Sequence, residues 1–428
     1  MQTQILPAKC FTGRVRLPGD KSISHRAAML SAIAEGRSVL HNFSTGADCH
    51  STLGCMEALG AGITKNGTEI TVDGVGLDGL RPAAGPLDAG NSGSTIRMLS
   101  GILAGQPFAT EIFGDESLSR RPMARIMAPL AQMGARVEAR DGKFPPLTVH
   151  GARPLKPIDF TPPVASAQVK TCVLFAGLYA EGVTTVREAV VTRDHGEMGL
   201  REFGAEVTST PGAISIVGRP RLVGREFHVP GDLSSAAFML VGALLIPGSS
   251  VVIEGVGLNP TRTALLDYLV GLGASIKILK YGQVSGELVG DLEVRYSPTS
   301  AGNISGALTA ALIDEIPVLS ILGAAGGGLT VSDASELRIK ETDRIATIEE
   351  NMRRAGVEIE TRPDGFTVPG GQKFRASTFD SFGDHRIAMA FSVASLVADQ
   401  PSTIEEAQAA SVSFPEFYSH VSRLSQPS

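Results

Sequence analysis

The chain carries one turn-and-helix phrase twice, about half its length apart. Residues 16–27 read "RLPGDKSISHRA" and residues 228–239 read "HVPGDLSSAAFM". Pro-Gly predicts a turn, and Asp or Ser predicts the N-cap of a following helix. Such a duplication indicates two related halves. A chain of 428 residues also exceeds one ordinary domain, since domains average ~150 residues.

The differences between the two copies are as informative as the shared residues. The first copy carries Lys21 and Arg26, where the second carries Leu233 and Phe238. We therefore expect the shared Pro-Gly-Asp and Ser to serve the architecture. The first copy is expected to belong to a functional site and the second to the scaffold.

A shorter signal recurs through both halves, at intervals of roughly 70 to 80 residues. Each time an amphipathic stretch ends at a glycine and alternating β-branched residues follow, as at Gly60, Gly134, Gly204, Gly273 and Gly356. A glycine in this place predicts a helix C-cap that leads into a strand.

Each repeat also contains an earlier helix rich in small residues. These stretches cover residues 22–36, 92–105, 166–182, 234–248, 304–327 and 384–399. Because small residues let backbones approach closely, we expect buried helices with sheets outside them. The predicted fold is α/β, with six strand-helix-strand-helix-strands repeats and three repeats in each half.

Composition argues against several classes of protein. Charged residues make up 19% of the chain and the net charge is -6, so we expect no nucleic-acid or membrane partner. No stretch approaches the ~18 uncharged residues of a membrane span. The four cysteines show neither CxxC nor zinc spacing, which indicates reduced thiols. We expect a soluble, cytoplasmic protein.

Polar and charged residues stand at the starts of four of the small-residue helices. They are Lys21, Ser22 and Arg26; Asn91, Ser92, Gly93 and Arg97; Ser166, Gln168 and Lys170; and Asp384 and Arg386. Helix starts are natural anion sites because their first N–H groups are unpaired and the helix dipole is positive there. Cations within apolar helices also require anionic partners.

Further charged clusters lie outside these helices. They are Arg120 and Arg121, the pair Asp314 and Glu315 before an apolar helix, and the group Lys340, Glu341 and Arg344. Surface salt bridges alone would explain the last group. All of the clusters together indicate a site for two acidic substrates, with carboxylates that move protons.

Long phrases of the sequence carry a family resemblance. They are "LPGDKSISHRAAML", "LDAGNSGSTIRMLSGILAGQPF", "GDESLSRRPMARIMAPLAQMGA", "SAQVKTCVLFAGLYAEG", "VPGDLSSAAFMLVGALLIPG", "SELRIKETDRIATIEENMRRAG" and "FGDHRIAMAFSVASLVA". They resemble the 5-enolpyruvylshikimate-3-phosphate (EPSP) synthase family over nearly the whole chain. The patterns "GDKSI", "SAQVK", "RDHGE" and "NPTR" are typical of its bacterial class II form.

The resemblance implies the two-domain enolpyruvyl transferase fold, an inside-out α/β barrel. The first domain is expected over 18–230, on the shikimate-phosphate side. The second is expected over 1–17 plus 231–428, with the catalytic carboxylates and the phosphoenolpyruvate clamp. Crossovers are expected near 14–20 and 227–232.

The resemblance also implies a reaction. The enolpyruvyl group of phosphoenolpyruvate moves to the 5-hydroxyl of shikimate 3-phosphate, on the route to chorismate, and phosphate is released. Addition and then elimination pass through a tetrahedral intermediate, without a metal or an organic cofactor. The protein is expected to act as a monomer and to be a target of glyphosate. Since Gly93 is retained, we expect partial glyphosate tolerance at most.

Residue roles follow from the same resemblance. Asp314 matches the candidate base, and Lys21 and Glu341 match groups that handle the proton at the methylene carbon; the resemblance does not choose between these two. The implied contacts to shikimate 3-phosphate are Lys21, Ser22, Arg26, Ser166, Gln168, Arg193, Asp314 and Lys340. The implied contacts to phosphoenolpyruvate are Lys21, Asn91, Gly93, Arg121, Gln168, Arg344, Asp384 and Arg386.

Two alternatives remain at this point. A sister enolpyruvyl transferase acts on UDP-N-acetylglucosamine, but it typically carries a Cys in the loop that reads "GDESLSRRPM" here. A catalytically silent homologue would keep the fold and the anion site. Retention of Lys21, Asp314, Glu341 and Arg386 favours an active enzyme.

Overall fold

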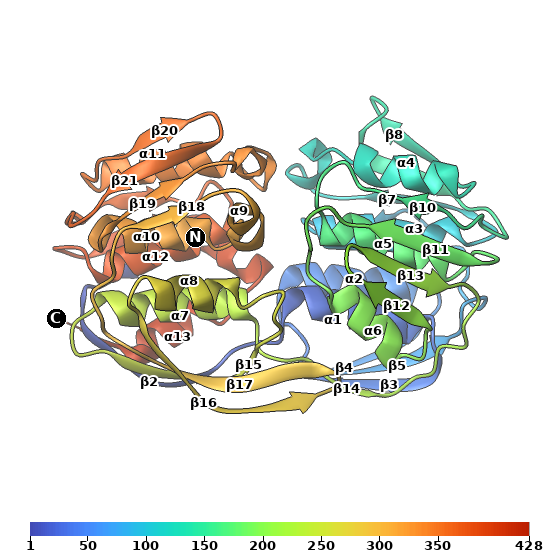
Figure 1. Ribbon diagram of the computed structural model, residues 1–428, viewed down its shortest axis with the longest axis horizontal. Coiled ribbons are helices and arrows are strands. Elements are labelled where there is room, and N and C mark those ends of the chain that lie inside the picture. Colours follow the sequence, from blue (N-terminus) through green and yellow to red (C-terminus); the bar gives the residue numbers. More distant parts are fainter. Residues whose placement is uncertain (428) are drawn as a thin grey trace. The chain divides into compact units, whose positions relative to one another are not determined.

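The structure is a computed structural model that describes residues 1–427, and the chain folds as two units (Figure 1). Unit 1 contains Met1–Pro18, Pro230–Gln283 and the chain from Leu288 onward. Unit 2 contains Gly19–Val229 and Val284–Glu287. Each unit has its own hydrophobic core. The chain passes from one unit to the other next to Pro18 and Pro230, the two prolines of the repeated phrase.

The sheets of unit 2 share one strand order. Each begins with a parallel pair and continues with antiparallel neighbours. Within the described residues they are β14 (Glu226–His228), β3 (Glu35–His41), β5 (Glu69–Val75) and β4 (Gly62–Asn66); β6 (Leu87–Asp88), β7 (Ala109–Phe113), β9 (Phe144–His150) and β8 (Arg136–Arg140); and β10 (Asp159–Phe160), β11 (Val183–Arg187), β13 (Ala213–Val217) and β12 (Val207–Thr210).

The helices of unit 2 are of two kinds. Those buried along most of their length are α1 (Lys21–Ala32), α3 (Gly93–Ala104) and α5 (Ala167–Gly177). Those with an exposed face are α2 (Ala47–Ala58), α4 (Ala124–Gln132) and α6 (His195–Glu202), and η1 (Leu118–Arg120) is a short 3-10 turn. A Cβ on Gly101 of α3 would lie 2.1 Å from the main-chain oxygen of Cys172 in α5, so this close helix packing requires glycine.

Unit 1 is built on the same plan. Among residues 1–427 its sheets are β16 (Ser275–Val284), β17 (Glu287–Arg295), β15 (Ser250–Gly257), β2 (Ala8–Arg16) and β24 (Ser425–Pro427); β18 (Gly302–Ile304), β19 (Gly328–Val331), β21 (Gly365–Pro369) and β20 (Glu360–Arg362); and β1 (Thr3–Ile5), β23 (Ser402–Glu405) and β22 (Thr378–Asp380). The last sheet takes its antiparallel strand β1 from the start of the chain.

Apolar helices again fill the middle of this unit. The buried helices are α7 (Leu233–Leu245), α10 (Ile316–Ala325) and α12 (His385–Leu396). The other helical segments are α8 (Ala264–Gly271), α9 (Ala307–Leu312), η2 (Ser335–Ile339), α11 (Arg344–Arg354), η3 (Ala407–Val412) and α13 (Phe417–Leu424). The expected α/β architecture of buried helices and outer sheets is confirmed.

One predicted helix is interrupted. The stretch 304–327 forms α9 and then α10, and Ile313, Asp314 and Glu315 lie between them. Pro317 explains the break, because proline lacks the N–H of an interior position and fits only the first turn of a helix. The interruption leaves the two carboxylates at the start of α10.

The predicted helix ends and starts are confirmed. Gly60, Gly134, Gly204, Gly273 and Gly356 all have positive φ, from 72° to 106°. They follow the C-cap residues of α2, α4, α6, α8 and α11. In the repeated phrase, Asp20 accepts from the N–H of Ile23 at 2.9 Å and Asp232 accepts from that of Ser234 at 2.8 Å. Across residues 1–427, every helix is too short or too polar to cross a membrane.

Candidate active site

Hydrogen bonds join the starts of the buried helices α1, α3 and α5 in unit 2. Arg26 of α1 donates through Nη2 to Thr171 Oγ1 of α5 at 2.9 Å. Gln168 of α5 donates through Nε2 to Ser94 Oγ of α3 at 2.9 Å. Arg97 of α3 donates through Nη1 to Gln168 Oε1 at 2.9 Å. The N-terminal ends of the three helices therefore lie together with cationic side chains, which favours an anion.

Lys21 is the first residue of α1, and Asp48 of α2 holds its side chain. The Lys21 Nζ lies 3.0 Å from Asp48 Oδ2, and the two side chains are 18% and 7% exposed. The ammonium group is thus oriented without being enclosed. Sequence analysis did not single out Asp48, which stands in the first turn of another helix.

Arg26 is buried and bonded to neutral oxygens. Its Nη1 donates to the main-chain oxygen of Ser22 at 2.8 Å, and its Nε donates to Thr171 Oγ1 at 3.2 Å. Gly196 lies against the same groups, since its Cβ would be 2.8 Å from Thr171 Oγ1 and 3.5 Å from Arg26 Nε. The segment that carries the predicted residue Arg193, which is partly exposed, therefore approaches α1 and α5.

The predicted residues Arg121, Asn91 and Gly93 lie together. Arg121 donates through Nη2 to Asn91 Oδ1 at 2.8 Å and to Ser117 Oγ at 2.9 Å. A Cβ on Gly93 would lie 2.6 Å from Arg97 Nη1 and 3.5 Å from Arg121 Nη1. The missing side chain at Gly93 thus leaves room for two guanidinium groups at the start of α3.

The start of α5 combines a cap with a buried ion pair. Ser166 is the N-cap and its Oγ accepts from the N–H of Val169 at 3.4 Å. Lys170 lies 3.0 Å from Glu188 Oε2 and 2.7 Å from Glu197 Oε1, and it is 1% exposed. Burial raises the pKa of the Glu197 carboxyl, although the charge of Lys170 acts in the opposite direction. Lys170 therefore has two carboxylate partners within the fold.

Arg344 is the centre of the charged cluster in unit 1. Its Nε lies 2.8 Å from Asp384 Oδ2, its Nη2 lies 2.6 Å from Glu341 Oε2, and its Nη1 lies 3.7 Å from Asp314 Oδ1. The side chain is 1% exposed. Burial alone lowers the pKa of the guanidinium, but the charges of Asp384, Glu341 and Asp314 outweigh it and hold the pKa above its usual value. Arg344 therefore remains a fixed positive charge.

Asp314 lies among cations at the start of α10. Its Oδ1 is 3.4 Å from Lys340 Nζ, and its main-chain oxygen accepts from Arg386 Nη1 at 2.7 Å. Arg386 is also 3.7 Å from Glu315 Oε1. The side chains of Asp314, Lys340 and Glu341 are 21%, 28% and 17% exposed. Two carboxylates that a ligand can reach thus stand beside fixed positive charges, as acid–base chemistry on an anion requires.

Comparison with known proteins identifies the family. The family model described as EPSP synthase (3-phosphoshikimate 1-carboxyvinyltransferase) matches residues 6–421. The chain belongs to the EPSP synthase family. It is 65% identical over its full length to the 3-phosphoshikimate 1-carboxyvinyltransferase of Solibacter usitatus, and the match covers 100% of both chains. It is 51% identical to that of Koribacter versatilis, with 98% of each chain covered.

Solved structures agree with this membership. An EPSP synthase from Acinetobacter baumannii matches with a TM-score of 0.88 and 40% identity, over 99% of this chain and 98% of the other. An enolpyruvyl transferase from Streptomyces tendae matches with a TM-score of 0.79 and 16% identity, over 98% of this chain and 96% of the other. The second likeness shows the enolpyruvyl transferase fold alone.

Supporting residues of this EPSP synthase family member were missed by sequence analysis. Ser234 Oγ is hydrogen-bonded to the Glu315 carboxylate, and Arg262 donates to Ser234 Oγ at 2.7 Å. Arg262 ends the "NPTR" phrase, which was noted only as typical of a subgroup. Through Glu315 these residues support Arg386. The motif was the signal that could have revealed them.

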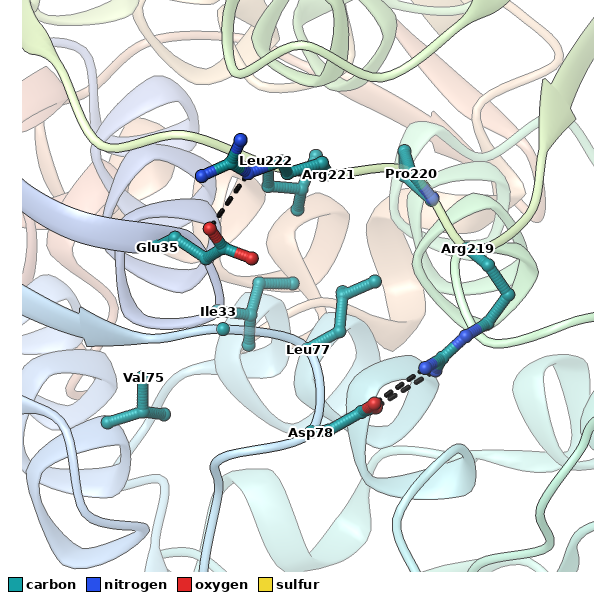
Figure 2. A pocket seen from close by; sticks show the side chains of 10 residues that line it. Ile33, Glu35, Val75, Leu77, Asp78, Arg219, Pro220, Arg221 and Leu222 are labelled. Atoms are coloured by element: carbon teal, nitrogen blue, oxygen red, sulfur yellow. Dashed lines mark hydrogen bonds and ion pairs between the residues drawn. The ribbon is translucent and has the colours of Figure 1, made fainter.

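A cavity of about 400 Å³ lies elsewhere in unit 2 (Figure 2). It is lined by Ile33, Glu35 and residues 75–78 and 219–222, which include no predicted site residue. Its guanidinium groups are paired, since Arg219 lies 2.6 Å from Asp78 Oδ2 and Arg221 lies 2.9 Å from Glu35 Oε2. The charge that an acidic substrate of an EPSP synthase would need is neutralised there.

Proposed function

We propose that this chain transfers the enolpyruvyl group of phosphoenolpyruvate to the 5-hydroxyl of shikimate 3-phosphate and releases phosphate. Relatives that are 65% and 51% identical over the chain carry the name of this activity. Within the structure, one observation carries the proposal. The reachable carboxylate of Asp314 stands 3.4 Å from Lys340 Nζ and 3.7 Å from Arg344 Nη1, which pairs a potential base with charges suited to two anionic substrates.

In the proposed addition, the Asp314 carboxylate removes the proton of the 5-hydroxyl. The hydroxyl oxygen then forms a bond to C2 of phosphoenolpyruvate, and the C3 methylene takes a proton to become a methyl group. Glu341 or Lys21 supplies that proton. The product of this step is a tetrahedral intermediate that still carries the phosphate.

In the proposed elimination, the bond between C2 and the phosphate oxygen breaks. A methyl proton returns to the protein, which restores the carbon–carbon double bond. The atoms balance without a redox partner, since phosphoenolpyruvate is already activated. Fixed cations lower the energy of the departing dianion because they need no reorganisation.

The proposed binding residues follow the charges of the two substrates. We assign shikimate 3-phosphate to Lys21, Ser22, Arg26, Ser166, Gln168, Arg193, Asp314 and Lys340. We assign phosphoenolpyruvate to Lys21, Asn91, Gly93, Arg121, Gln168, Arg344, Asp384 and Arg386. Asp384 is fully buried and bonded to Arg344, so its proposed part is to position that guanidinium.

Phosphate release from phosphoenolpyruvate tests the proposal. We expect release only when shikimate 3-phosphate is present, and none with UDP-N-acetylglucosamine. Release with the sugar nucleotide would transfer the assignment to the sister activity. No release with either acceptor from folded protein would identify a silent homologue.

We also propose that the protein works as a cytoplasmic monomer without a nucleic-acid partner. The modest net charge of -6 supports this, since it offers no global attraction to polyanions. Light scattering of the purified chain checks the oligomeric state, and a mass of two chains would overturn the monomer.

A further inference from the structure

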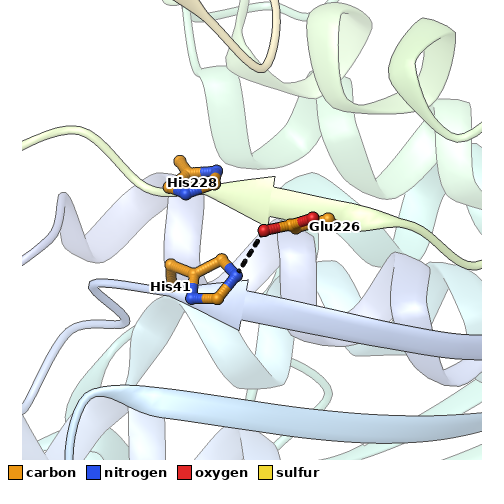
Figure 3. Close-up of side chains that lie close together, drawn as sticks. All are labelled: His41, Glu226 and His228. Carbon is orange, nitrogen blue, oxygen red and sulfur yellow. Dashed lines mark hydrogen bonds and ion pairs between the residues drawn. The ribbon is translucent and has the colours of Figure 1, made fainter.

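Two histidines and a glutamate share one face of a sheet in unit 2 (Figure 3). Strands β3 and β14 are parallel neighbours, and His41 stands directly opposite His228. Glu226 precedes His228 by two residues, so both side chains point to the same side of β14. None of the three residues belongs to the proposed substrate contacts.

The side chains of this cluster are already close together. His41 Nε2 lies 2.9 Å from Glu226 Oε1, and the two imidazole rings stack with centroids 4.4 Å apart. One possible ligand atom from each residue lies within 4.8 Å of the others. A tetrahedral ion with bonds of 2.0–2.1 Å needs its ligands about 3.3 Å apart. Glu226 and His228 are exposed and His41 is half-buried, so small rotations of these side chains can close that difference.

A fourth residue orients one of the histidines. Glu69, at the start of β5, places Oε2 3.2 Å from His41 Nδ1. A carboxylate that accepts the Nδ1–H orients the ring so that Nε2 faces the ion, which is the usual support of a metal-bound histidine. The other ring nitrogen, Nε2, faces Glu226, so His41 has a carboxylate at each nitrogen.

We propose that His41, Glu226 and His228 bind a divalent transition-metal ion, with Zn²⁺ as the representative ion. Two imidazoles and one carboxylate form a donor set that suits Zn²⁺, Ni²⁺ or Cu²⁺ better than Mg²⁺ or Ca²⁺. Three protein ligands leave a position for water. The carboxylates of Glu226 and Glu69 supply the negative charge that a divalent cation requires.

The site would fasten the end of β14 to β3. The two strands are already joined beyond the cluster, because Val229 N–H donates to His41 O at 2.9 Å and Asn42 Nδ2 donates to Val229 O at 3.0 Å. Val229 is the last residue before the chain leaves unit 2. An ion that binds the folded strands and not the unfolded chain would raise the thermal midpoint of the protein.

Titration of the full-length, chelator-treated protein with Co²⁺ and Zn²⁺ tests the proposal. We expect one visible-absorbing Co²⁺ per chain, displaced by Zn²⁺, and a Zn²⁺-dependent rise in the thermal midpoint. His41→Ala and His228→Ala should each weaken binding by at least tenfold, and Glu226→Gln should weaken it less. His150→Ala is the matched control, since His150 lies 3.5 Å from Glu138 but has no place in the cluster.

Circular dichroism without metal establishes that each variant is folded. The proposal is overturned if the wild-type chain shows no saturable Co²⁺ site. It is equally overturned if the folded histidine variants bind as tightly as the wild type, because the ion would then lie elsewhere, for example at Cys10.

Discussion

At the scale of single residues, Lys21 is a residue that the proposed reaction needs and the fold does not. The equivalent helix α7 begins with Leu233, so the fold does not need a lysine in this place. We predict that Lys21→Met lowers the rate of phosphate release by at least about 100-fold, since it removes a cation and a candidate proton donor. The variant should still fold, because α7 forms with a leucine in this place, although the buried carboxylate of Asp48 loses this ammonium partner. A variant within a few-fold of the wild-type rate would remove Lys21 from the proposed mechanism.

At Gly93, the room left by the missing side chain is expected to determine how well phosphoenolpyruvate and glyphosate bind. A methyl group there would stand 2.6 Å from Arg97 Nη1, the flexible end of a side chain that also holds Gln168. We predict that Gly93→Ala raises the KM for phosphoenolpyruvate several-fold and raises the inhibition constant of glyphosate by a larger factor. Steady-state inhibition against varied phosphoenolpyruvate measures both. Equal changes in the two constants would contradict a steric effect specific to the longer inhibitor.

The partners of the charged site residues could not be predicted from the sequence. Lys21 and Arg26 were predicted because charges stand out in a small-residue helix. Their partners Asp48 and Thr171 come from other helices, and only packing brings them near. No local pattern distinguishes such a residue from an ordinary cap or a buried hydroxyl.

At the scale of elements, the contact between α3 and α5 depends on one glycine. We predict that Gly101→Ala destabilises the fold by several kcal/mol, because its methyl group would meet backbone that cannot move aside. Gly54→Ala is the control. Gly54 lies exposed inside α2 with nothing within 4 Å, so alanine there should stabilise by ~0.5–1 kcal/mol.

Chemical denaturation of the two variants measures this difference. A Gly101→Ala protein as stable as Gly54→Ala would show that α3 and α5 do not pack as closely as described.

A buried histidine within a hydrogen-bond chain across three helices makes the stability of the fold depend on pH. His25 of α1 lies 2.7 Å from Thr52 Oγ1 of α2, which lies 2.7 Å from Thr95 Oγ1 of α3. Burial, together with the charges of Lys21 and Arg26, holds the pKa of His25 well below its usual value of about 6.5. The unfolded chain therefore binds this proton first, so stability is complete above pH ~6.5 and falls as the pH drops.

We predict that His25 contributes a slope of up to ~1.4 kcal/mol per pH unit below pH ~6.5. His25→Gln should flatten the dependence of the unfolding free energy on pH between about 6.5 and 5. His50→Gln serves as the comparison and should flatten the dependence less, because partial burial lowers the pKa of His50 less than full burial lowers that of His25. An unchanged slope in His25→Gln would mean that the imidazole is protonated in the folded protein.

Element boundaries were predictable where their causes are local. The five glycines that follow C-cap residues have positive φ because each comes after the end of a helix, and their spacing helped to reveal the repeats. The strand β1 illustrates the opposite case. It pairs with β23, almost the whole chain away, and a three-residue strand carries no signal of its partner.

At the scale of the whole molecule, two related units carry different chemistry. Lys21, Arg26 and Arg121 lie in unit 2, and Asp314, Glu341, Arg344 and Arg386 lie in unit 1. The family and the fold were predictable because long phrases are retained along the chain. The ion network around Arg344 was predictable only in its members, since its geometry depends on the starts of α10, α11 and α12 meeting.

The fate of one oxygen atom tests the central claim most directly. Phosphoenolpyruvate labelled with ¹⁸O between C2 and phosphorus is incubated with shikimate 3-phosphate and the enzyme, and the phosphate is analysed by mass. Enolpyruvyl transfer breaks the bond between carbon and oxygen, so the label should leave with the phosphate. Label retained in pyruvate would mean hydrolysis at phosphorus and would contradict the proposed function.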